Sequence, residues 1–255
     1  MNAKQITIPS LEFFHSILRG FRHHEGAGVW FRGQSDSSWS LLPKAGRSSH
    51  YLPDNRDLGR FNAWRHDAYP YLDVDIQRDF EMLAYAQHHG LATRLLDWTA
   101  NPLVAAYFSV SADADKDGLI FCYSPEVFVD LETAKIRQDG LHGAGLITPA
   151  FDGRMLNQKG LFTVHSPPDA SLEVQPISFM PEEPNLHILV IPAELKEDLR
   201  LQLGDYGITE HFIFPDVDGV ARHINADTEL MAKKSAQQGA APNRLTHSES
   251  DFSDD

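Results

Sequence analysis

Seven polar residues that are able to bind ligands or move protons stand at or near the ends of short apolar segments. They are Arg32, Gln34, His88, Thr93, Asp97, Thr99 and Glu210. An arginine can hold a phosphate through two parallel hydrogen bonds, and a carboxylate can stabilise a positive charge that develops during a reaction. Either Glu210 or His88 has the chemistry of a general base. Polar groups of these kinds around one cleft would form a small-molecule site.

Each of these residues also has a purely structural interpretation. Arg32 can be the ion-pair partner of Asp97, and His88 can be a helix-end residue favoured by the helix dipole. Thr99 is β-branched and suits a strand, and Glu210 can be a solvated turn residue. Taken one at a time, the residues leave both interpretations open. Taken together, their shared position at strand ends favours a site.

The chain lacks the common frames for metal binding and catalysis. It has 13 histidines, but His23 with His24 and His88 with His89 are adjacent pairs, which do not easily point at one ion. No phosphate-binding loop, dinucleotide glycine fingerprint or nucleophile elbow is present. We therefore expect no metal. The single cysteine, Cys122, lies in an apolar run and is expected to be a buried structural thiol rather than a nucleophile.

The net charge of −14 argues against broad attraction to nucleic-acid backbones. The segment from Lys44 to His66 differs, because it holds five lysine and arginine residues against Asp54 and Asp57. Such a local positive charge could face a pyrophosphate or a nucleic acid, or it could be a solvated loop.

No apolar run approaches the roughly 18 to 20 residues that a membrane span needs. The N-terminus lacks the pattern of a signal peptide, so a cytoplasmic protein without membrane contact is expected. We expect one domain over residues 1–231. Residues 232–255 are polar and acidic and predict a poorly ordered tail.

The elements that would position the polar residues follow from periodicity and capping. An amphipathic helix is expected at residues 8–20, a strand at 29–33 and a helix ending near Gly90, where glycine permits a left-handed cap. Residues 35–70 predict a long loop with helical pieces near 58–65. A strand over 93–99 would place Thr93, Asp97 and Thr99 on one face. Asn101 and Pro102 predict the start of the next helix.

Further strands are expected at 119–123, 161–164, 186–191 and 211–214, with a helix over 192–203 before the last. Strands and helices mix without strict alternation, which favours an α+β fold with mixed, mostly antiparallel sheets and flanking helices.

Several segments resemble the FRG-domain family. They are Trp30–Gln34, Gln87–Pro102 and Ala105–Phe108, with weaker similarity at 154–162 and 207–219. The run from His89 through Thr99 is long enough to be specific. The order of these blocks is similar to that of mono-ADP-ribosyltransferases, in which an arginine holds the phosphates of NAD and a glutamate orients the acceptor. This resemblance implies an ADP-ribosyltransferase-like fold.

On that resemblance, Arg32 is expected to bind the NAD phosphates. Either Asp97 or Glu210 would supply the carboxylate near the ribose. Gln34, Thr93 and Thr99 would hydrogen-bond the ribose or the carboxamide. Tyr85, Trp98 or Phe108 would stack on nicotinamide, although plain core packing also explains these aromatics. The chain departs from the pattern in two places. Leu96–Thr99 replaces a Ser-Thr-Ser strand, and His211 occupies the register position where the glutamate is expected.

The first hypothesis is therefore an NAD-dependent mono-ADP-ribosyltransferase of the toxin or antiviral-defence type. It would modify a macromolecule, possibly RNA or DNA, and an inhibitory antitoxin-type protein would restrain it. The alternative is a non-enzymatic nucleotide- or protein-binding module on the same fold. A third hypothesis is a nucleic-acid hydrolase that uses the histidines and Asp97.

Overall fold

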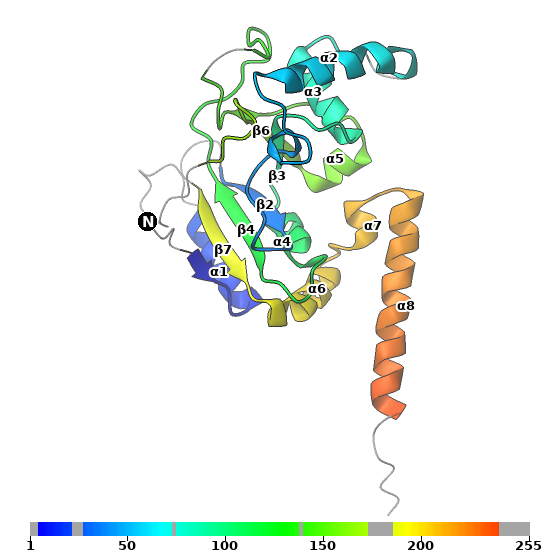
Figure 1. The fold of residues 1–255 in the computed structure, drawn as a ribbon. Helices are drawn as coiled ribbons and strands as arrows, with labels where there is room; N and C mark the ends of the chain where they lie inside the picture. Colours follow the sequence, from blue (N-terminus) through cyan, green and yellow to red (C-terminus); the bar gives the residue numbers. More distant parts are fainter. Residues whose placement is uncertain (1–4, 22–27, 73–74, 138–139, 173–185, 240–255) are drawn as a thin grey trace, which may run out of the picture.

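A single mixed sheet of seven strands forms the centre of the molecule (Figure 1). The computed structural model describes residues 5–21, 28–72, 75–137, 140–172 and 186–239. In sheet order the strands are β1 (Gln5–Thr7), β7 (His187–Ile191), β4 (Gly118–Tyr123), β2 (Trp30–Gln34), β3 (Leu95–Thr99), β6 (Gly160–Val164) and β5 (Gly145–Leu146). Among the paired strands of the described residues, only β1 and β7 run parallel. The α+β class and the mostly antiparallel pairing are confirmed.

The described residues also form eight α-helices. They are α1 (Leu11–Phe21), α2 (Arg56–Ala68), α3 (Asp79–His88), α4 (Pro102–Val110), α5 (Gly153–Gln158), α6 (Lys196–Asp205), α7 (Glu210–Ile213) and α8 (Val217–Gly239). Short 3-10 helices lie at Lys44–Gly46, Tyr69–Tyr71 and Ala193–Leu195. The predicted caps are confirmed, because Leu103 N donates to Asn101 Oδ1 over 3.0 Å and Gly90 has a φ of +92°.

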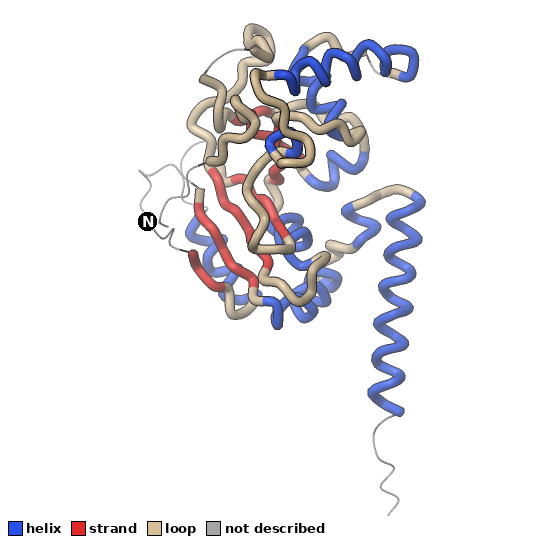
Figure 2. The backbone as a smooth tube through the Cα atoms, viewed as in Figure 1, coloured by secondary structure: helices blue, strands red, loops and turns tan. Residues whose placement is uncertain are grey.

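Alternate strand residues point to opposite faces of the sheet, and the helices α1, α3, α4, α5 and α6 pack against one of these faces. Phe31, Ile120 and Leu189 face the helices α1, α4 and α6 in one core cluster. Leu95 and Phe162 face α3 and α5 in a second. On the other face, the sheet residues pack against loops, which cross in front of the strands in Figure 2.

The sheet opens between β2 and β3. These two strands share only the Phe31–Thr99 pair, whereas β2 pairs with β4 at five positions and β3 pairs with β6 at five. Gly33, on the diverging part of β2, lies against α4. A Cβ at Gly33 would sit 1.9 Å from the carbonyl oxygen of Ala105. The glycine therefore permits a close strand–helix approach at the place where the strands separate.

Two sequence predictions about the C-terminal part need correction. The strand predicted at 211–214 is wrong, because Glu210–Ile213 is the short helix α7. Thr209 caps it by accepting a hydrogen bond from Phe212 N, and a local capping signal outweighed the apolar β-like run. The helix α8 continues past residue 232 to Gly239 and projects from the body in Figure 1. Residues 240–255 of the expected tail lie outside the described residues.

The segment before α3 is tied to the sheet by a buried ion pair that the sequence did not predict. Arg94 is 1% exposed, and its Nε and Nη2 each donate to the Asp57 carboxylate over 2.8 Å. Asn55 Oδ1 also accepts from Arg94 Nη2, over 3.0 Å. Arg94 thereby joins the N-terminal turn of α2 to the start of β3.

Candidate functional site

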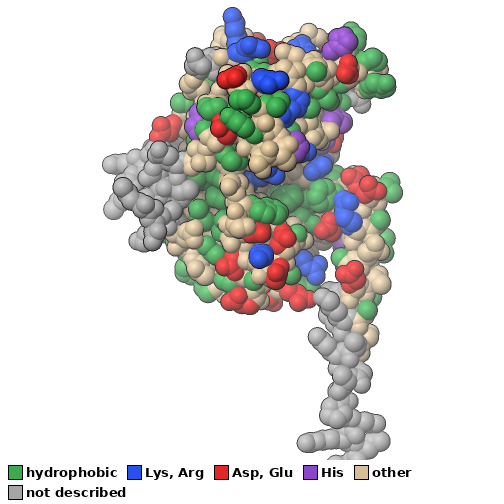
Figure 3. Space-filling view, viewed as in Figure 1, with side chains coloured by type: hydrophobic (Ala, Val, Ile, Leu, Met, Phe, Trp, Pro, Cys, Tyr) green, Lys and Arg blue, Asp and Glu red, His purple; other side chains and the backbone are tan. Residues whose placement is uncertain are grey.

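A cavity of about 500 Å³ lies where β2 and β3 diverge. Residues of both strands line it, together with residues of α3, α4, α5 and the loop around Lys44. Figure 3 shows a hollow on this face of the molecule, with apolar side chains inside it and basic side chains near its rim. Its volume is within the range of small-molecule sites.

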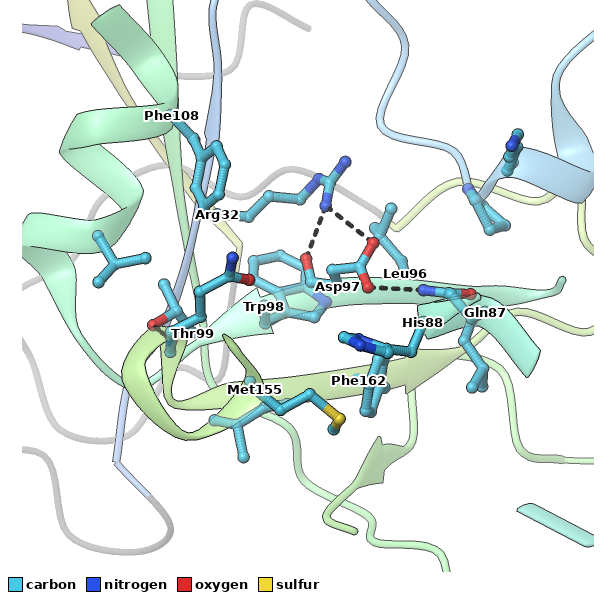
Figure 4. A pocket seen from close by; sticks show the side chains of 18 of the residues that line it. Arg32, Gln87, His88, Leu96, Asp97, Trp98, Thr99, Phe108, Met155 and Phe162 are labelled. Carbon is cyan, nitrogen blue, oxygen red and sulfur yellow. Dashed lines mark hydrogen bonds and ion pairs between the residues drawn. The ribbon is translucent and has the colours of Figure 1, made fainter. Parts of the chain in front are cut away.

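Arg32 bridges the gap between the two strands. Its Nη1 donates to the Asp97 carbonyl oxygen over 2.8 Å and lies 3.8 Å from Asp97 Oδ2 (Figure 4). Because β2 turns away from β3, it leaves the Asp97 carbonyl oxygen without a strand partner. The Arg32 guanidinium donates to this oxygen instead. The predicted structural alternative, an Arg32–Asp97 ion pair, is present, but it does not close the cavity.

Arg32 retains capacity to bind a ligand. Its side chain is 16% exposed and lines the cavity, whereas the Asp97 side chain is 62% exposed. The enclosed Nε of Arg32 has no hydrogen-bond partner among the described residues. Burial lowers the pKa of the guanidinium below its ordinary value; the Asp97 charge opposes this effect, and the Arg47 charge adds to it. Arginine nevertheless stays protonated in proteins at neutral pH, because its ordinary pKa is far higher.

Three further cations line the same cavity: Lys44, Arg47 and Arg154. Lys44 Nζ donates to the Gly90 carbonyl over 3.0 Å, and Arg47 Nε donates to the Leu42 carbonyl over 3.3 Å. Among the lining residues, Asp97 is the single carboxylate. Four cations against one anion make this cavity attractive to an anionic ligand, in contrast to the acidic chain as a whole.

Gln87 is a cavity residue whose polar role the sequence did not indicate, because its place on the helical face suggested packing. Its Nε2 donates to Asp97 Oδ1 over 2.6 Å, as Figure 4 shows. Thr93 Oγ1 donates to Gln87 Oε1. Thr93 thus contacts the site through Gln87 and does not line the cavity.

His88, at the end of α3, lines the cavity beside Gln87. Its Nε2 lies 2.7 Å from Asp152 Oδ2. The other oxygen of Asp152 accepts from Met155 N over 2.9 Å and caps α5. A neutral His88 therefore carries its proton on Nε2, because a lone pair so close to a carboxylate oxygen would be repelled.

The remaining predicted polar residues divide into two groups. Thr99 lines the cavity, but it is buried, and its hydroxyl donates to the Gln158 carbonyl and accepts from Asn101 N. Gln34 lies outside the lining; its Nε2 donates to the Trp39 carbonyl over 3.1 Å. The structure therefore brings Arg32, His88, Asp97 and Thr99 to one cavity and leaves Gln34 in the packing around it.

Glu210 lies in a neighbouring hollow of about 470 Å³. It accepts a hydrogen bond from the Tyr107 hydroxyl, and its Oε2 lies 3.4 Å from Arg222 Nε. Burial, followed by the Glu210 contact, raises the pKa of Tyr107 above its ordinary range. Phe108 and Arg154 line both hollows and mark the boundary between them. The carboxylate expected from the resemblance is thus adjacent to the main cavity but does not line it.

The three predicted aromatics occupy different positions. Phe108 and Trp98 line the cavity, and Trp98 Nε1 donates to Thr163 Oγ1 over 2.8 Å. Tyr85 lies outside the lining and packs in the core against Phe151 and His89. Of the three, Phe108 is the half-buried aromatic that lines the cavity.

In the described part of the chain, no group of three or more histidine, cysteine, aspartate or glutamate side chains is arranged to hold a metal ion. Cys122 is fully buried, as predicted, and burial raises the pKa of its thiol, which disfavours the nucleophilic thiolate. No helix of the described part is long and apolar enough to cross a membrane.

The fold is an α+β domain whose sheet is split at a cationic cavity of small-molecule size. Residues 27–118 match the family model of the FRG domain, so this segment of the chain is similar to that family. The matched segment contains the cavity residues Arg32, His88 and Asp97, whereas α5 lies beyond it. No curated protein and no solved structure matches the chain.

Proposed function

We propose that this chain is an NAD-dependent mono-ADP-ribosyltransferase whose active site is the cavity between β2 and β3. The observation that carries the proposal is that four cations, Arg32 among them, line this cavity. Asp97 is the single carboxylate that lines it with them. The partly buried guanidinium of Arg32 lies close enough to Arg47 for their charges to repel. A pyrophosphate between them would relieve that repulsion.

The residues divide the chemical work between them. In the reaction with NAD, the nicotinamide–ribose bond breaks with its electron pair on nicotinamide, the acceptor nucleophile bonds to the ribose, and the acceptor releases a proton. Arg32, Lys44 and Arg47 bind the phosphates. Asp97 stabilises positive charge that develops on the ribose. His88 is placed by Asp152 to accept the proton of the acceptor.

The wider role rests on the family resemblance of the sequence. The proposed acceptor is a macromolecule such as RNA or DNA, which fits a toxin or antiviral-defence enzyme. An inhibitory protein partner and a cytoplasmic setting complete this proposal. The fold would then be ADP-ribosyltransferase-like, with β2 carrying the phosphate-binding arginine.

The test uses NAD labelled on its adenylate phosphate, incubated with purified protein and cell extract. We expect label to enter a macromolecule and nicotinamide to be released. Arg32→Ala should abolish both, whereas Arg65→Ala, which breaks an exposed pair with Asp79, should not. Absence of transfer and of nicotinamide release from the unaltered protein would exclude the enzyme.

A nucleotide-binding module without catalysis is the second candidate. The observation that favours it is the position of Glu210, which leaves Asp97 alone in the cavity and already in contact with Gln87 and Arg32. Calorimetry with NAD separates the two functions. Binding that Arg32→Ala removes, with no nicotinamide release, would identify the module.

A further inference from the structure

A hydrogen-bond chain with one fixed direction ends on the carboxylate of Asp97. It begins at Leu95 N, which donates to Thr93 Oγ1 over 3.1 Å. Thr93 Oγ1 donates to Gln87 Oε1, and Gln87 Nε2 donates to Asp97 Oδ1 over 2.6 Å. A backbone N–H can only donate, so the first bond of this chain cannot be reversed.

The Asp97 carboxylate fixes the orientation of the Gln87 amide, because its oxygens accept hydrogen bonds and the amide must therefore turn its NH₂ group toward them. If the amide were flipped, its oxygen would face the Asp97 carboxylate, and two acceptors would oppose each other. With the hydroxyl of Thr93 donating to Oε1, the NH₂ group faces Asp97. Thr93 is 2% exposed, so water does not readily replace this hydroxyl.

Asp97 is consequently the final acceptor of the chain. Oδ1 accepts from Gln87, and Oδ2 lies 3.8 Å from Arg32 Nη1. The Asp97 side chain is still 62% exposed, so the anion is accessible to a ligand. In Figure 4, the Gln87 and Arg32 contacts reach the carboxylate from different directions.

We propose that Gln87 and Thr93 are positioning residues, which hold the Asp97 carboxylate in the orientation needed for it to face positive charge on a bound ligand. The kinetic consequence of this inference rests on the proposed function. The hydrogen-bond chain itself is a property of the ligand-free protein, so it has a separate spectroscopic test.

The test compares Thr93→Val, which removes the hydroxyl at nearly constant volume, with Thr93→Ser, which keeps it. The ligand-free readout is the side-chain amide proton signal of Gln87 in NMR spectra. We expect a signal shifted by the charged acceptor in the unaltered protein and in Thr93→Ser, and a return toward the position of an exposed glutamine in Thr93→Val. Identical amide signals in all three proteins would overturn the inference.

The kinetic readout is nicotinamide release. We expect Thr93→Val to lower kcat about 10-fold to 100-fold with KM changed less than about 3-fold, and Thr93→Ser to restore most of kcat. Equal losses in the two variants would overturn the positioning role, because loss of the hydroxyl would then not be the cause.

Gln87→Met serves as a second variant if Thr93→Val does not fold, because Gln87 is only half-buried. It should give the same loss of kcat with an unchanged thermal melt, and full kcat in this variant would overturn the inference. If the Gln87 signal behaves as expected but the unaltered protein releases no nicotinamide, the proposed function fails and the hydrogen-bond chain stands as the means by which a binding module orients Asp97.

Discussion

Arg94 and Asp57 form a two-point ion pair in the interior, with both side chains at most 2% exposed and two N–O distances of 2.8 Å. Removal of one partner would leave the other charge buried and unpaired. We expect Arg94→Met to lower the free energy of unfolding by about 3–5 kcal/mol, as measured by urea denaturation. Arg65→Met breaks a half-exposed pair and should cost less than about 1 kcal/mol. Similar losses in the two variants would contradict this assignment.

Gly33 is expected to be intolerant of even one added carbon. An alanine Cβ there would sit 1.9 Å from Ala105 O and 2.7 Å from Ser109 N, so α4 would have to move. Gly33→Ala should destabilise the protein by about 1–3 kcal/mol and weaken ligand binding, because both β2 and α4 line the cavity. Gly59→Ala, inside α2 with no atom within 4 Å of the new carbon, should instead add about 0.5–1 kcal/mol. Thermal melts of the two variants provide the comparison.

His165 makes the stability of the fold depend on pH. It is fully buried, and burial lowers its pKa from 6.5 to about 4. Between these values the unfolded chain binds more protons than the folded chain, so stability falls as pH falls from 6.5 toward 4. The total loss is about 3 kcal/mol. Urea denaturation across this range should show the slope in the unaltered protein and in the exposed control His66→Gln, but a much smaller slope in His165→Gln.

Asp97 and Glu210 are expected to contribute unequally to turnover. Asp97 lines the cavity with Arg32, whereas Glu210 contacts Tyr107 and Arg222 in the neighbouring hollow. Asp97→Asn should lower kcat for nicotinamide release about 100-fold, and Glu210→Gln less than about 10-fold. Thermal melts control for folding. A loss in Glu210→Gln as large as that in Asp97→Asn would show that the two hollows act as one site.

The sequence by itself predicted most of the local structure. Apolar periodicity and the capping signals at Asn101 and Gly90 identified the main helices and strands, because these patterns depend on neighbouring residues. The segment 211–214 was one exception, since a short apolar run suits a strand and a helical turn equally. The extension of α8 beyond residue 232 was another. The candidates Arg32, His88, Asp97 and Thr99 were also evident from the sequence, as polar groups at the ends of apolar segments.

Only the tertiary structure decided which of these residues share a cavity. The divergence of β2 from β3 places Arg32 against Asp97, and α5 brings Asp152 to His88. The tertiary structure also distinguishes two of the arginines of the matched segment. Arg94 is paired in the interior, whereas Arg32 lines a cavity and its Nε has no hydrogen-bond partner among the described residues. Contacts between residues 32 and 97, or 57 and 94, depend on how distant segments pack, and local sequence patterns carry no record of that packing.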